Sequence, residues 1–74
     1  MRAYIFIKFE ADANLDKIQH TLMEPQIINI DMIMGPYDAV VNVDAENLDS
    51  LGKLAQRVRM CPGIRDSITC QVIS

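Results

Sequence analysis

The chain has 74 residues, 50% of them hydrophobic, and ten acidic against seven basic residues give it a net charge of −3. A chain this short forms one domain. Because it buries only about 60% of its unfolded surface, it is marginally stable without disulfides, a metal or partner subunits. The acidic balance argues against nucleic-acid binding by the chain alone, since neutralising phosphates requires several convergent cations.

Cysteine and histidine are scarce in this sequence. Cys61, Cys70 and His20 are too few for a disulfide framework or a zinc site, so we predict no metal and no cofactor. Self-association is therefore the expected source of additional stability. No apolar run approaches the ~18 residues of a membrane span, and the N-terminus lacks a secretory layout, so we expect no membrane contact. Free cysteines without an export signal favour a cytoplasmic location.

Residues 3–9 are rich in β-branched and aromatic residues and predict the first strand. Its alternation gives two faces, which are Ala3, Ile5, Ile7 and Phe9 against Tyr4, Phe6, Lys8 and Glu10. Asn14 then caps a helix that ends before Pro25. Its apolar stripe consists of Leu15, Ile18, Leu22 and Met23. His20 lies off this stripe and is interpreted as a solvated residue.

Residues 27–34 and 39–44 both alternate apolar and polar side chains and predict a hairpin with Gly35-Pro36-Tyr37-Asp38 as its turn. Gly35 tolerates backbone angles closed to other residues and Pro36 presets its own φ, so the reversal is encoded locally. The first strand has Ile28, Ile30, Met32 and Met34 on one face and Ile27, Asn29, Asp31 and Ile33 on the other. In the second, Ala39, Val41 and Val43 oppose Val40, Asn42 and Asp44.

A second helix begins after Asn47, a further asparagine cap, and ends at the Cys61-Pro62-Gly63 segment. Its apolar stripe consists of Leu48, Leu51, Leu54, Ala55 and Val58. Residues 66–73 predict the last strand, with Ile68, Cys70 and Val72 on its apolar face and Ser67, Thr69, Gln71 and Ile73 on the other. Cys70 is accordingly interpreted as a small core residue.

The order of elements predicts an α+β fold, a ferredoxin-like βαββαβ sandwich in which two helices cover one face of a four-stranded antiparallel sheet. We expect the helices to cover Ile5, Ile30, Val41 and Ile68. The other face would carry Tyr4, Phe6, Ile33, Val40 and Ile73 beside Asn29, Asn42, Ser67 and Thr69. Such an apolar face requires a cover. A second sheet packed about 10 Å away would supply it, so we expect a homodimer or a larger assembly.

Two segments carry a family resemblance across residues 1–74. Gly35-Pro36-Tyr37-Asp38 followed by Ala39-Val40-Val41 resembles the Gly-x-Tyr/Phe-Asp hairpin of the RAM (regulation of amino-acid metabolism) domain. This is the effector-binding domain of the Lrp/AsnC transcription regulators. Pro62-Gly63-Ile64 and Ser67-x-Thr69 are similar to its Pro-Gly-Val and Thr-x-Thr segments. Regulators of this family carry a helix-turn-helix domain before the effector domain. This chain starts at the first strand of that domain, so it resembles a stand-alone member.

The resemblance implies sheet-to-sheet dimers that assemble into rings, commonly of four dimers (an octamer), with amino-acid sites between neighbouring dimers. A free amino acid needs an anion near its ammonium and donors near its carboxylate. Asp38 would supply the anion and backbone N–H groups of the Gly35-Pro36 turn the donors. The hydroxyls of Ser67 and Thr69 could bond to either end, and Tyr37 could wall the side-chain pocket. Ser67 stands where the family motif has threonine, which puts ligand identity in question.

Three alternatives remain at this level. The hairpin could be purely architectural. The chain could be a dimeric α+β barrel enzyme using His20, Tyr4, Asp31 or Asn42, although His20 lies on a helix that covers the opposite face from a sheet cavity. Finally, it could be a ligand-free interaction module that joins full-length Lrp/AsnC-type regulators. The sequence favours a non-enzymatic, amino-acid-binding regulatory module that oligomerises and does not itself bind DNA.

Overall fold

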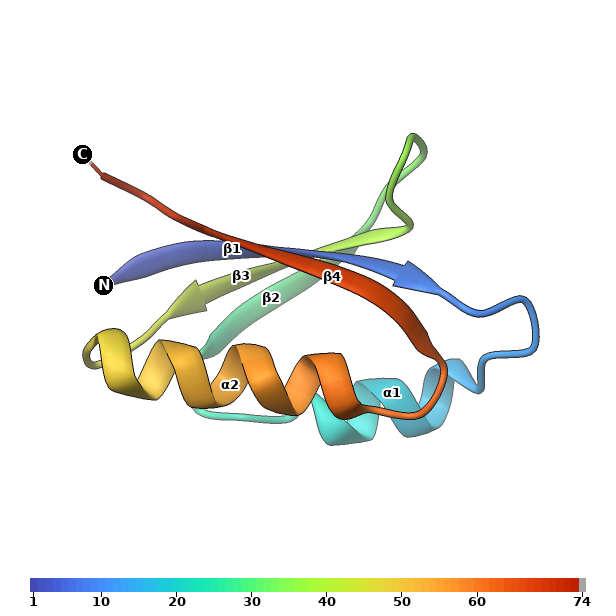
Figure 1. Cartoon of the computed structure of the whole chain (residues 1–74), viewed down its shortest axis with the longest axis horizontal. Coiled ribbons are helices and arrows are strands. Elements are labelled where there is room, and N and C mark those ends of the chain that lie inside the picture. The colour runs from blue at the N-terminus through green and yellow to red at the C-terminus, as the bar shows by residue number, and fades with distance from the viewer. Residues whose placement is uncertain (74) are drawn as a thin grey trace.

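The computed structural model describes residues 1–73 and has the predicted order of elements (Figure 1). They are β1 (Arg2–Phe9), α1 (Leu15–Thr21), β2 (Ile27–Met32), β3 (Ala39–Asp44), α2 (Leu48–Met60) and β4 (Ile64–Gln71). All strand pairs are antiparallel, in the order β2-β3-β1-β4. Both helices lie on one side of the sheet. The predicted ferredoxin-like α+β fold is confirmed.

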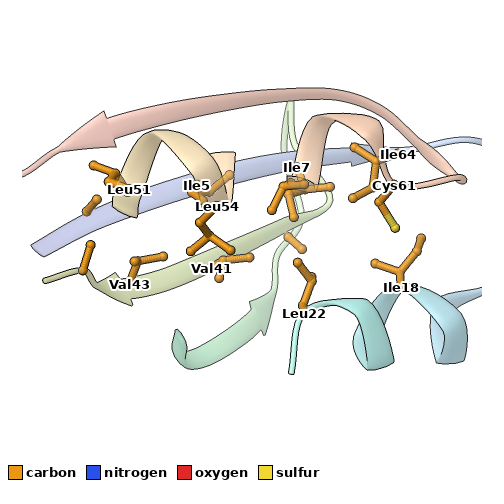
Figure 2. Packing of buried hydrophobic residues seen from close by; sticks show 14 residues of the cluster. Ile5, Ile7, Ile18, Leu22, Val41, Val43, Leu51, Leu54, Cys61 and Ile64 are labelled. Carbon is orange, nitrogen blue, oxygen red and sulfur yellow. The ribbon is translucent and has the colours of Figure 1, made fainter. Parts of the chain in front are cut away.

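The hydrophobic core lies between the sheet and the helices (Figure 2). Its largest fully buried side chains are Ile5, Ile7, Ile18, Val41, Val43, Leu54 and Val58. Each such side chain contributes on the order of 1.5–3 kcal/mol through removal of apolar surface from water. The face of β1 and β3 that was predicted to be covered is therefore the covered one.

Both helices begin at the predicted asparagine caps. The side-chain Oδ1 of Asn14 accepts a hydrogen bond from the Lys17 backbone N–H at 3.2 Å, and that of Asn47 accepts one from Ser50 at 2.8 Å. Helix α1 is short, however, with seven residues, and two turns place only Ile18 and the C-cap Leu22 against the sheet. The remaining apolar residues predicted for the two stripes are exposed at Leu15, Met23 and Leu48.

The loop between α2 and β4 depends on Gly63. Its φ is +93°, and an added Cβ would lie 3.1 Å from Cδ1 of Ile18 and 3.3 Å from Cβ of Ala13. Any other residue would thus be strained and would push against α1. Cys61, the C-cap residue of α2, is buried in the same region.

The predicted faces of β2 are wrong in part. Its register against β3 shifts between Ile27 and Asn29, so Ile27 pairs with Val43 while Ile30 pairs with Val41. Both isoleucines therefore pack against the core, and the bulged Ile28 is exposed. The strand also ends at Met32, two residues before the predicted end, and Met34 lies fully exposed in the turn.

The predicted faces of β4 are reversed. The strand begins at Ile64, and its register against β1 shifts at Lys8 and Phe9, which places Ser67 opposite Ile7. A one-residue bulge moves every later side chain to the other face. Ser67 is thus buried on the helix side, whereas Ile68 and Cys70 are exposed opposite Phe6 and Tyr4. The core role of Cys70 and the helix cover over Ile68 were both wrong predictions.

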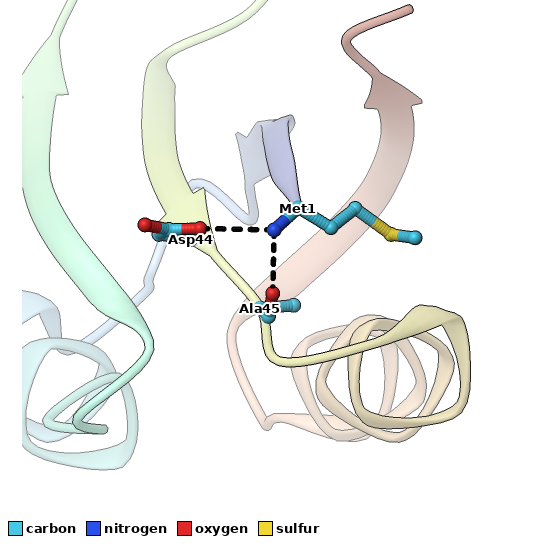
Figure 3. Close-up of polar contacts among 3 residues, drawn as sticks. All are labelled: Met1, Asp44 and Ala45. Atoms are coloured by element: carbon cyan, nitrogen blue, oxygen red, sulfur yellow. Dashed lines mark hydrogen bonds and ion pairs between the residues drawn. The ribbon is translucent and has the colours of Figure 1, made fainter.

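The two ends of the described chain lie close together (Figure 1). The Met1 ammonium donates to Asp44 Oδ1 at 3.1 Å and to the Ala45 carbonyl at 2.8 Å (Figure 3). The Val72 N–H donates to the Arg2 carbonyl at 2.9 Å. The start of β1 is therefore fastened on both sides. Within residues 1–73, neither helix is long and apolar enough to cross a membrane.

Candidate functional site

The Gly-Pro-Tyr-Asp hairpin extends beyond the sheet, on the side away from the helices (Figure 1). The Ile33 N–H donates to the Asp38 carbonyl at 3.0 Å and closes the turn. Gly35 and Pro36 are exposed, and no atom lies within 4 Å of the position where a Gly35 side chain would stand. The tip of the hairpin is thus accessible to other molecules.

Asp38 has a structural role in this hairpin. Its backbone N–H donates to the Ile7 carbonyl at 2.9 Å, and its Oδ2 accepts from the Phe9 N–H at 2.8 Å. The carboxylate thereby extends the β1–β3 ladder by one hydrogen bond beyond Ala39. Within residues 1–73, no group donates a hydrogen bond to Oδ1. Asp38 is therefore oriented by the fold and keeps one oxygen for another partner.

Tyr37 packs toward the sheet. Its ring centroid lies 5.8 Å from that of Phe6, with 52° between the planes, which is a favourable tilted aromatic pair. The hairpin and the open face of the sheet are therefore one continuous surface. Tyr37 joins the apolar residues at the sheet centre.

The open face of the sheet has an apolar centre. Phe6 stands between Val40 of β3 and Ile68 of β4, and Tyr4 stands between Asn42 and Cys70. Tyr4 on the central strand β1 is 37% exposed, and Ile68 on the edge strand β4 is 43% exposed, although both side chains are large. Toward β2 the face becomes polar, where Asn42 Nδ2 donates to Asn29 Oδ1 at 2.5 Å.

Ser67 and Thr69 lie on the other side of the sheet, in a groove between β4 and α2. The groove is lined by Gly52, Ala55, Gln56, Arg59, Met60, Ser67, Ile68 and Thr69. Arg59 Nη2 lies 3.5 Å from the Ser67 carbonyl, and Asp66 Oδ1 accepts from the Ser67 N–H at 2.9 Å. One chain therefore brings Gly35, Pro36, Tyr37 and Asp38 together in the hairpin and holds Ser67 and Thr69 apart from them.

Sequence reasoning missed Arg59 and Gln56 in this groove. The signal was present, because residues 52, 55, 56 and 59 have the i, i+3, i+4, i+7 spacing of one helical face. That face lies beside the apolar stripe of the helix and contains Gly52, so its spacing alone does not distinguish a binding surface from a solvated one.

The residues of the enzymatic alternative do not converge. His20 is exposed on α1 and lines a groove with Asp16 and Glu24, whereas Tyr4 and Asn42 belong to the open face. The solvated interpretation of His20 is confirmed. Among residues 1–73 there is also no group of three His, Cys, Asp or Glu side chains that could hold a metal ion.

A four-stranded sheet with helices on one face, an open apolar face and an acidic hairpin defines a small ferredoxin-like α+β domain. The profile of the family described as the Lrp/AsnC ligand binding domain matches residues 2–74, and this chain belongs to that family. The resemblance expected from the hairpin and Pro-Gly segments is confirmed. None of the curated proteins compared with the sequence matches it.

Solved structures of similar fold are of two lengths. FFRP-DM1 is 23% identical with a TM-score of 0.84, and the alignment covers 97% of each chain. The hypothetical protein PHS023 from Pyrococcus horikoshii is 21% identical with a TM-score of 0.79, covering 99% of this chain and 90% of that one. The L-Met complex of the transcriptional regulator NMB0573 from Neisseria meningitidis is 12% identical with a TM-score of 0.85. The alignment covers 99% of this chain but only 49% of that regulator, so this chain spans about half of the regulator's length.

Proposed function

We propose that this chain is an amino-acid-binding regulatory module that oligomerises and modulates Lrp/AsnC-type transcription regulation without binding DNA itself. The observation that carries the proposal is the family match over residues 2–74. A ligand-binding domain in a family of regulators supports a regulatory, ligand-binding role. The net charge of −3 supports the absence of direct DNA contact, because phosphate binding needs clustered cations.

The proposed effector is a free amino acid. The relative from Neisseria meningitidis was solved in complex with L-Met, which supports this ligand class for the family fold. Asp38 keeps Oδ1 for an ammonium group, and the N–H groups of the Gly35-Pro36 turn are the first candidates for the carboxylate. Tyr37 would contact the effector side chain, and Ser67 and Thr69 would contribute from a second chain.

Self-association through the open face is the second part of the proposal. The apolar centre around Phe6, Val40 and Ile68 would be removed from water by a second sheet packed about 10 Å away. A ring of such dimers, an octamer being the expected size, would bring the hairpin of one chain toward the β4 side of another. Partners would be copies of this chain and full-length Lrp/AsnC-type regulators, in the cytoplasm.

Thermal melting of the purified protein against each of the twenty amino acids at millimolar concentration tests the effector. A ligand at one hundred times its dissociation constant stabilises the folded state by about 2.7 kcal/mol, which raises Tm by several degrees in a domain of this size. A shift with one amino acid, or with a few related ones, supports the proposal. If all twenty leave the Tm unchanged, the amino-acid part is refuted.

A ligand-free interaction module is the second candidate. The bond between the Asp38 carboxylate and the Phe9 N–H favours it, because this bond gives the hairpin acid an architectural role without any ligand. The two candidates differ in the melting experiment. They agree in expecting no enzymatic activity.

A further inference from the structure

The groove between α2 and β4 has an electrostatic character unlike the rest of this acidic molecule. Its lining contains one cation, Arg59, and no carboxylate. The groove beside α1 and β2, in contrast, is lined by Asp16, Glu24 and a single histidine. The α2–β4 groove holds about 580 Å³, within the range of about 300–1,000 Å³ typical of small-molecule sites.

Arg59 is available for a ligand in a way that its helical neighbours are not. Lys53 pairs with Asp49, and Arg57 pairs with Glu24. Within residues 1–73, Arg59 has no carboxylate partner, and its Nη2 makes one long hydrogen bond of 3.5 Å to the Ser67 carbonyl. A guanidinium has five N–H donors in a planar fork that matches a carboxylate. Most of these donors remain unused.

Two residues with hydroxyl groups line the same groove as this guanidinium. Ser67 is 3% exposed and Thr69 half-buried, and both point to the helix side of β4, at neighbouring positions of the same face. Hydroxyls can rotate to donate to an oxygen anion. The sequence expectation that both residues contact a ligand stays a prediction, now on the helix side of the sheet and not on its open face.

Gly52 is the remaining unusual feature of the groove. A glycine weakens a helix interior relative to alanine, yet no atom lies within 4 Å of the position that a Gly52 side chain would occupy. Packing inside the chain thus gives no reason for glycine at this position. Gly52 lines the groove together with Thr69, and a side chain at this position would stand in unfilled space.

We propose that the α2–β4 groove binds a carboxylate group, held by the Arg59 guanidinium and the hydroxyls of Ser67 and Thr69. The inference rests on the proposed function, since the carboxylate would be that of the amino-acid effector. It assigns this group to Arg59 in place of the turn N–H groups. Because the hairpin lies on the opposite side of the sheet, the ammonium would go to Asp38 of a second copy, and one chain holds only half of the site.

Acetate is the probe for the groove, because it carries a carboxylate and no ammonium. Two-dimensional ¹⁵N NMR spectra of the whole chain would be recorded during titration with sodium acetate, with sodium chloride at equal ionic strength as reference. We expect saturable shifts of the Ser67 and Thr69 amides and of the Arg59 Nε–Hε. Arg59→Gln should abolish them. Lys53→Gln, which removes a cation from the same helix outside the groove, should leave them unchanged.

Gly52→Leu supplies a second variant that adds bulk without removing charge. Its side chain points into open space, so the fold should persist, and acetate shifts at Thr69 should weaken severalfold. Equal shifts with chloride, or shifts that survive in Arg59→Gln, would overturn the inference. An amino acid that raises Tm equally in the parent and in Arg59→Gln would overturn it too, while leaving the proposed function intact. Acetate binding at these residues, with no amino acid raising the Tm, would support the groove as a carboxylate site and refute an amino acid as the effector.

Discussion

The two faces of the sheet both carry apolar residues, but only one of them is buried within the chain. Along β1, Ile5 and Ile7 are completely buried beneath the helices, whereas their neighbours Tyr4 and Phe6 face away from them. One face is completed inside the chain by α2 and, less fully, by the short α1. The other face has no cover within residues 1–73. The difference teaches that the apolarity of a strand face and its burial within the chain are separate properties. The uncovered face is the one that the proposed self-association would bury.

The largest expected effect comes from the covered face. Ile5→Ala removes a side chain that is 0% exposed, and such truncations cost about 2–5 kcal/mol through lost burial and the cavity left behind. We expect a large fall in the free energy of unfolding, measured by urea denaturation, with the association state unchanged where the protein remains folded. A cost below ~1 kcal/mol would contradict the described core.

Substitution of the adjacent residue, Phe6, should change the association state. Phe6→Lys places a charge at the centre of the open face, which a second sheet could not bury without a partner. Sedimentation or light scattering should then give the mass of one chain, where the parent gives a multiple. The matched control is Lys17→Gln, an exposed change on α1. A parent protein that is already monomeric at micromolar concentration would refute the proposed dimer.

Two substitutions of Asp38 separate its structural role in the hairpin from its proposed role in binding an ammonium group. Asp38→Ala leaves the Phe9 N–H without its partner, which costs about 1–3 kcal/mol for a buried donor and less where water can reach it. Asp38→Asn keeps an oxygen acceptor and should cost less. Both variants remove the charge, so both should abolish amino-acid binding measured by calorimetry. Undiminished affinity in Asp38→Asn would exclude the ammonium role.

The smallest loss of stability is expected from substitutions at the caps of the two helices that cover the buried face. Asn47→Ala removes the bond to the Ser50 N–H and should destabilise the fold by about 1 kcal/mol. Asn14→Ala tests the shorter α1 in the same way, through its longer bond to Lys17. Urea midpoints of the two variants should both fall, with no change in association state. Equal loss of association would link the caps to the open face, against the separation of the two faces.

Local signals were sufficient for much of the fold. The alternation of β3 and the asparagine caps at positions 14 and 47 predicted the observed starts of the elements. The faces of β4 could not be predicted from apolarity, because Ile68 and Cys70 are more hydrophobic than Ser67 and Thr69, which occupy the helix side. Only the register against β1, with its bulge, determines which of the two sets faces the helices.

The candidate site, like the fold, was predictable from the sequence only in part. The hairpin residues were identified by their turn chemistry, but the bond from Phe9 to Asp38 depends on the pairing of β1 with β3, which lies 29 positions away in sequence. The separation of the hairpin from Ser67 and Thr69 follows from the β4 bulge. The spacing of residues 52 to 59 places Arg59 on one helical face, but the groove that this face borders depends on how β4 packs beside α2.

The closeness of the two chain ends also determines how the molecule would respond to mechanical load. β1 and β4 are antiparallel neighbours, and their paired residues at this end are Ala3 and Gln71, next to the bond from Val72 to Arg2. Opposing forces on the ends would act across the ladder, so its hydrogen bonds would open one after another, as in a zipper. The edge strand β4 would peel away first and carry Thr69 and Ser67 out from beneath α2. In a tethered protein, tension would therefore dismantle the groove before the helix-covered centre of the sheet.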